Sequence, residues 1–230
     1  MHSPIEMSAP NLLNDDGSVS MATMFMMAHH ALRRDLTRFT KALNALTVPD
    51  AERVQALQNE WKYYRGALHG HHMMEDERIF PHLSSSQASL APIIAHLTEE
   101  HHRIEPLLER GDRGFEALPD TAEAKAVIAE LRTLLEPHLT TEETEVVPFL
   151  REARQFPTPS NDEEVELYAQ GFAWTSHGVA PEVLECLYAM LPENLTSRLP
   201  AARAELDRRC ERAWGSTKAG NTRTPIPNGP

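Results

Sequence analysis

The sequence predicts an all-α protein, an antiparallel up-down-up-down four-helix bundle with a small helical C-terminal extension. Three observations predict this fold. Apolar residues recur at alternating steps of three and four along four consecutive segments, each of roughly 25 to 35 residues, the length of long bundle helices. Turn signals separate the segments at Val48-Pro49-Asp50, Ser84-Ser85-Ser86 and Leu118-Pro119-Asp120-Thr121. Each segment has a single apolar face, and four such faces are hidden by packing against each other.

The apolar stripes define the four bundle helices in chain order. The stripe residues are Met21, Phe25, Leu32, Leu36 and Leu43 in the first helix, Leu57, Trp61, Leu68 and Ile79 in the second, Leu90, Ile94, Leu97 and Ile104 in the third, and Ile128, Leu131, Leu135, Val146 and Phe149 in the fourth. Residues three or four apart lie on one side of a helix, so we expect each set to face the common core.

The composition of the remaining segments predicts the domain boundaries. Residues 1–18 mix Ser, Pro, Asn, Asp and Gly without an apolar period and are predicted to be a disordered leader. The rest of the chain divides into a bundle at 19–155, a helical extension at 162–214 and a polar, Pro- and Gly-containing disordered tail at 215–230. Helical signals in the extension lie near Glu163–Trp174, Pro181–Leu191 and Leu195–Trp214. Its apolar residues Leu184, Leu187, Tyr188 and Leu191 dock either onto the bundle or onto a second copy, which would make a homodimer.

Charge and composition exclude several classes of protein. The 230 residues include 22 Lys and Arg against 34 Asp and Glu, a net charge of -12, which opposes nucleic-acid binding through a basic surface. No stretch approaches the roughly 18 apolar residues of a membrane span, and the N-terminus lacks the pattern of an export signal, so we expect a cytoplasmic protein without a membrane partner. Cys186 and Cys210 have no CxxC spacing, which excludes a cysteine-based metal site.

Histidines interrupt the apolar stripe of every bundle helix. Of the 12 His in the chain, four fall on the stripes when the steps of three and four are continued, and two Glu follow at the next step. These inward-facing residues are His29 in the first helix, His71 and Glu75 in the second, His101 in the third, and His138 and Glu142 in the fourth.

Four histidines and two carboxylates at one level of a core predict a metal site. A buried ionisable group needs a partner, and a single core histidine usually finds one through a hydrogen bond. Coincidence across four helices opposes that simpler explanation and favours metal binding. Imidazole and carboxylate without thiolate suit iron or manganese, with zinc as a further alternative. Two carboxylates that can each bridge indicate two ions, and the same six residues would then be the catalytic ones.

Five further residues are candidates for additional ligands or for hydrogen-bonding partners of the ligands. They are His72, Asp76, His96, Glu100 and Glu143. His72 follows a stripe residue by one position, a rotation of about 100° around the helix axis, so it contacts the site from the side or faces solvent. Glu143 is the alternative to Glu142, and Asp76, Glu99 and Glu100 are candidate acceptors for the ring N–H groups of the ligands.

At these residues the sequence resembles the hemerythrin-like family, also called the HHE cation-binding domain. The resemblance covers about residues 20–152 and rests on MAHHALRRDL around His29, LHGHHMMEDERIFP around His71 and Glu75, LTEEHHRIEPLL around His101, and EPHLTTEETEVVPFL around His138 and Glu142. It implies two non-heme iron ions, bridged by oxide or hydroxide and by both glutamates, inside an up-down-up-down bundle.

Two departures from the oxygen-carrying members change the expected function. Those proteins supply two histidines four residues apart from the third helix, whereas Leu97 stands four residues before His101 here. They also space the histidine and carboxylate of the fourth helix by five, whereas the stripe here favours four. With four histidines, two six-coordinate ions keep about two open positions, so we expect an exchangeable position on both irons.

The expected ligand is therefore a small molecule, O2, hydrogen peroxide or NO. Catalase- or peroxidase-type handling of hydrogen peroxide, as in a response to oxidative stress, is the favoured activity. The alternative is a non-enzymatic protein, either a sensor of O2, NO or redox state or an iron-binding protein, in which the 162–214 extension reads the state of the centre.

Overall fold

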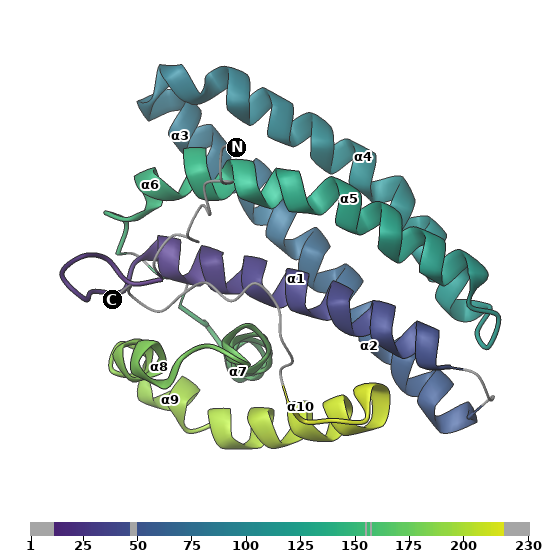
Figure 1. The fold of residues 1–230 in the computed structure, drawn as a ribbon. Coiled ribbons are helices and arrows are strands. Elements are labelled where there is room, and N and C mark those ends of the chain that lie inside the picture. Colours follow the sequence, from purple (N-terminus) through teal and green to yellow (C-terminus); the bar gives the residue numbers. More distant parts are fainter. Residues whose placement is uncertain (1–11, 47–49, 155, 157, 219–230) are drawn as a thin grey trace, which may run out of the picture.

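The computed structural model describes residues 12–46, 50–154, 156 and 158–218, and within this part of the chain it contains helices and no strand. The predicted all-helical class is confirmed. Four long helices, α1 (Met21–Ala45), α2 (Ala51–Met74), α4 (Ala91–Glu116) and α5 (Ala122–Glu145), pack side by side (Figure 1). The shorter elements are the π-helical turn η1 (Glu75–Ile79), α3 (Phe80–Ser86), the 3-10 turn η2 (Ala88–Leu90), α6 (Val147–Leu150), α7 (Asp162–Ser176), α8 (Pro181–Tyr188), α9 (Glu193–Thr196) and α10 (Leu199–Trp214).

Local sequence signals fix several helix ends. The Asp50 carboxylate accepts hydrogen bonds from the backbone N–H groups of Glu52 and Arg53 and so caps α2. Gly215 ends α10 with φ of 68°, a left-handed conformation that favours glycine. Pro148 has no N–H to donate to the preceding turn, and the helix is interrupted at Val146, between α5 and α6. Because of this break Phe149 is 39 % exposed, and its predicted place on the apolar stripe is wrong.

The four long helices bury two apolar clusters, and the predicted site lies at the level between them. The cluster toward the α4–α5 turn ends with Leu68 on α2, and the other cluster begins with Phe80 at the start of α3. On α4 the same boundary falls between Leu97 and Ile104. His71, Glu75 and His101 fall in these intervals, so they are held by apolar packing on both sides.

The helix α1 lies between the rest of the bundle and the C-terminal helices α7 to α10 (Figure 1). α7 contacts α1, and α10 contacts α2 as well as α7. One apolar cluster contains residues of α1 and of all four C-terminal helices, including Leu187, with Leu184, Tyr188 and Leu191 packed against it. These four residues therefore pack within this chain, while the homodimer and the division into two domains stay predictions.

The chain ends differ in part from the predicted disorder. Leu12 and Leu13, inside the predicted leader at 1–18, are buried, and the Asn14 side chain donates to the Arg151 carbonyl. At the other end the Lys218 carbonyl accepts a hydrogen bond from Arg38. The rest of the predicted leader, residues 1–11, and the tail from 219 onward lie outside the described residues. No helix of the described part combines the length and the apolar content that a membrane crossing requires.

Candidate metal centre

All six predicted ligands lie together in the interior. The ring nitrogens and carboxylate oxygens of His29, His71, Glu75 and Glu142 fall within 4.8 Å of one another. A second group with the same spacing contains His101, His138 and again Glu75. Apart from His71, whose side chain is 10 % exposed, these residues are buried. The continuation of the apolar stripes thus placed them on the correct helix faces, and their role as ligands stays a prediction.

Each glutamate presents one oxygen to each of the two groups. Glu75 has Oε1 at 3.2 Å from Nε2 of His71 and Oε2 at 3.4 Å from Nε2 of His101. Glu142 repeats this arrangement from the opposite helix, with Oε2 at 3.3 Å from Nε2 of His29 and Oε1 at 3.3 Å from Nε2 of His138. This is the disposition that two carboxylates bridging a pair of cations require.

His72 also belongs to the centre, which the stripe argument did not establish. Its ring is buried, stacks on His101 at a centroid distance of 4.0 Å, and completes the second group with Glu75, His101 and His138. The two groups therefore differ, because His29 and His71 serve one while three histidines serve the other.

The spacing within α2 and η1 explains how neighbouring histidines serve different groups. At about 100° per residue, Glu75 lies about 40° around the axis from His71, and His72 lies about 100° from it, so the glutamate falls between the two histidines. The π-helical turn η1 begins at Glu75 itself, and such turns occur frequently at functional sites. The signal that could have identified His72 is this HHxxE spacing, which fits two positions that share one carboxylate.

The donor set contains seven buried atoms that have no hydrogen-bond partner among the described residues. These atoms are Nε2 of His72, His101 and His138, and both carboxylate oxygens of Glu75 and of Glu142. An unpaired buried polar atom costs about 1–3 kcal/mol, so seven of them in one place are not tolerated without compensation. Cations at the two groups would satisfy all seven, and the residues fit such ions.

The surroundings of His71 and His72 favour neutral imidazoles that can bind metal. Burial, and next the neighbouring His29, lower the pKa of His71 to about 3. Burial also lowers the pKa of His72, followed by the effect of His101. Neutral imidazole is the ligand form, so at neutral pH these rings need not lose a proton before they coordinate.

The two buried glutamates have opposite pKa shifts. Burial, and next the charge of Glu142, raise the pKa of Glu75 well above its usual value. Burial acts in the same direction on Glu142, but its contacts with His138 and His29 outweigh burial and lower the pKa. Without a cation the pair therefore keeps a proton on Glu75, since two close carboxylates do not both ionise in a buried site. Cations would displace this proton.

Three of the histidines donate their other ring nitrogen to a carboxylate. Nδ1 of His101 lies 2.9 Å from Asp76, and Nδ1 of His138 lies 2.9 Å from Glu100, as the sequence suggested. Nδ1 of His29 lies 3.1 Å from Glu143, which Arg33 also contacts. Glu143 is thus placed behind His29 and is not in either group of candidate ligands among the described residues. Such partners orient the ring and raise its basicity as a ligand.

The remaining candidates lie outside the centre. His96 is 64 % exposed and pairs with Glu100 at 3.5 Å on the outer side of α4. Glu99 lies 3.8 Å from the exposed ring of His102 and contacts no histidine of the centre, so its predicted acceptor role is wrong.

We expect Asp76→Asn to weaken metal binding at the three-histidine group by at least about 10-fold, because the variant removes the charged acceptor of His101 Nδ1. Competition with a chromophoric chelator measures this affinity. Glu99→Gln is the matched control and leaves the affinity unchanged, since Glu99 contacts only the exposed His102 among the histidines. Equal affinities of Asp76→Asn and the wild type would contradict the orienting role of Asp76.

The helices and the buried side chains define an all-α protein with a paired histidine and carboxylate site of the kind that holds metal cations. A family model described as the hemerythrin HHE cation binding domain matches residues 20–150, more than half of the chain. The chain belongs to this family. Comparisons with curated proteins and with solved structures find no match.

Proposed function

We propose that this protein holds two iron ions and uses them to bind O2, hydrogen peroxide or NO. The observation that carries the proposal is the set of seven buried, unpartnered donor atoms in two groups that share Glu75. Iron is favoured over manganese and zinc by the mixture of imidazole with bridging carboxylate and by the family to which the chain belongs. An alternating up-down order of α1, α2, α4 and α5 is part of the proposal, because each contacts the next and α5 contacts α1.

The unequal donor sets support an exchangeable position on one ion. His29, His71 and the two glutamates offer four donors to the first ion, and with about six positions and one bridging oxide or hydroxide about one position stays open. His72, His101, His138 and the two glutamates would offer five donors to the second ion, so the same bridging group would fill its last position. This replaces the expectation of open positions on both ions, which assumed four histidines.

Protein residues around the two-histidine group would control what reaches it. The Phe25 ring packs against His29 and His71, with centroid distances of 4.5 and 5.1 Å. Phe25 is buried in the apolar cluster at this end of the bundle, so it excludes water from this side of the centre and favours weakly polar ligands. When bound, the iron pair supplies the electrons that a reaction with O2 or peroxide needs.

Turnover of hydrogen peroxide is the leading activity, and a sensor or iron-binding protein is the alternative. The open position and the redox-active pair support the first. The second is supported by α1, which carries His29 and is also buried against the C-terminal helices. A cytoplasmic location and the small-molecule partner stay predictions from the sequence.

Purification from iron-supplied cells tests the proposal. We expect about two irons per chain and near-ultraviolet bands of an oxide-bridged pair. Addition of hydrogen peroxide with a record of oxygen release then separates the two functions, because an enzyme releases oxygen over many cycles and a sensor gives one stoichiometric spectral change. Protein that binds neither iron nor another divalent cation under these conditions would contradict the metal centre.

A further inference from the structure

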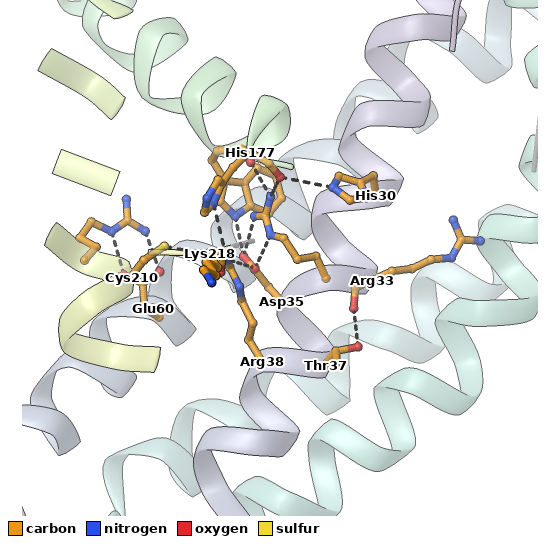
Figure 2. Close-up of polar contacts among 12 residues, drawn as sticks. His30, Arg33, Asp35, Thr37, Arg38, Glu60, His177, Cys210 and Lys218 are labelled. Carbon is orange, nitrogen blue, oxygen red and sulfur yellow. Dashed lines mark hydrogen bonds and ion pairs between the residues drawn. The ribbon is translucent and has the colours of Figure 1, made fainter. Parts of the chain in front are cut away.

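The helix α1 has two buried faces, one toward the metal centre and one toward the C-terminal helices. His29 faces the centre, and Arg33 contacts Glu143 and Glu136 of α5. The next residues along the chain face the other way. Nε2 of His30 lies 3.3 Å from the His177 carbonyl, and Arg34 donates to the same carbonyl at 2.9 Å. In Figure 2 the side chain of Arg33 points away from His177, while His30 points toward it.

A buried ionic network joins α1 to the end of α7. Arg34 is fully buried and forms an ion pair with Asp35 at 2.8 Å, while it also donates to the Trp174 carbonyl. Asp35 accepts a second ion pair from Arg38 at 3.1 Å and a hydrogen bond from the Trp174 ring N–H at 2.6 Å. Charges buried this far from water are costly to separate, so the docked arrangement of these residues is specific.

His177 links the network to the chain beyond α10. Burial, and next the charges of Arg34 and Arg38, lower the pKa of His177 to about 4, so the ring is neutral at neutral pH. Its Nδ1 accepts from Arg38 at 3.3 Å, which leaves Nε2 to donate to the Thr217 carbonyl at 2.9 Å (Figure 2). The network therefore ties α1 to the end of α7 and to the chain that follows α10.

A second contact joins the C-terminal unit to α2 without α1. Arg209 of α10 forms a bidentate ion pair with the buried Glu60, at 2.7 and 2.9 Å. Its guanidinium also lies over the Tyr63 ring, 3.4 Å from the centroid. The two contacts can be removed separately, and this makes the role of α1 testable.

We propose that α7 to α10 report whether the metal centre is occupied, because they undock only when α1 leaves the position in which His29 binds metal. The inference rests on the proposed metal binding, and it identifies α7 to α10 as the part of the protein that responds to the bound metal. Bound cations would join α1 to α2, α4 and α5 through shared ligands, so an opening that displaces α1 requires their release. Metal then opposes undocking by linkage, whereas an opening that leaves α1 in place is insensitive to metal.

Hydrogen exchange of the full chain, with and without anaerobically added ferrous iron, tests this coupling. At a free iron concentration of about 100 Kd, amides that exchange through an opening that releases one ion slow by about 100-fold. We expect slowing of at least about 10-fold in peptides covering 162–176 and 199–214, as in α1. The turn at 117–121 between α4 and α5, which contains none of the candidate ligands, serves as the reference and keeps its rate.

Two variants separate the α1 contact from general docking. Arg34→Met removes the hydrogen bonds from α1 to the Trp174 and His177 carbonyls, while Asp35 keeps Arg38 and Trp174 as partners, so the effect of iron on exchange in 162–176 becomes smaller. Arg209→Gln removes the contact with α2 and raises exchange in both states, but the effect of iron persists. Iron content is measured on each sample. Bound iron without slower exchange in wild-type 162–176 overturns the coupling alone, whereas absence of bound iron overturns the proposed function and the coupling with it.

Discussion

Glu142→Ala is expected to abolish stable occupancy of both metal positions, lowering the metal content from about two ions per chain to well below one. Glu142 is fully buried, and its two oxygens lie 3.3 Å from Nε2 of His29 and from Nε2 of His138. Each group therefore loses a donor in one substitution. The variant also removes the glutamate whose pKa is lowered, and so the carboxylate that is ionised before metal arrives.

Thermal unfolding with and without metal measures this loss independently of content. Each ion at about 100 Kd stabilises the wild type by about 2.7 kcal/mol, so two ions raise the melting temperature by about 10–20 °C for a chain of this size. Glu142→Ala should show no such shift. Circular dichroism of the apo variant checks that it still folds, because removal of one partner of a buried pair is destabilising. Glu145→Ala, on the exposed side of the same helix, is the control and keeps both ions. Two ions bound to Glu142→Ala would contradict its bridging role.

His72→Ala is expected to weaken one of the two ions by about 100-fold or more and to leave the other in place, since the loss of a ligand exceeds the 10–100-fold effect of an outer partner. The group of His29 and His71 keeps all its donors in this variant. Calorimetric titration with ferrous iron should resolve a strong and a weak event. His69→Ala is the matched control, because the His69 ring is exposed and pairs with Glu105 across the surface.

The number of NO molecules bound per centre is a second test of whether His72 is a ligand. With His72 as a ligand, the reduced wild-type centre has about one open position and binds about one NO. Without it, both ions have an open position and bind about two. An unchanged iron titration of His72→Ala together with two NO per wild-type centre would show that His72 is not a ligand. The centre would then have four histidine ligands and two equivalent ions.

The sequence predicted six residues of the centre because the spacing of residues along a helix determines the side of the helix on which each one lies. A histidine three or four residues from a core leucine shares its face, and this rule brought His29, His101 and His138 to one level of three helices. The rule considers only one direction around each helix. Two cation positions need ligands from a wider range of directions, so His72, at about 100° from His71, belongs to the second group although the stripe rule did not place it there.

Partners contributed by other helices could not be read from spacing within one helix. Glu143 follows Glu142 directly, and its position behind His29 depends on how α5 lies against α1. The same limit applies to Glu99 and Glu100, which are equivalent by composition. The structure places Glu100 beside His138 and leaves Glu99 beside an exposed ring.

The sequence by itself determined the helical class, the four long helices and the helix faces that carry the histidines and glutamates, because amphipathic period and turn chemistry act over a few residues. Only the tertiary structure decided the division of donors between two groups, the place of His72 and the burial of both faces of α1. The C-terminal helices cover Arg34 and Asp35 through contacts about 140 residues away in the chain, and such long-range packing leaves no local period in the sequence.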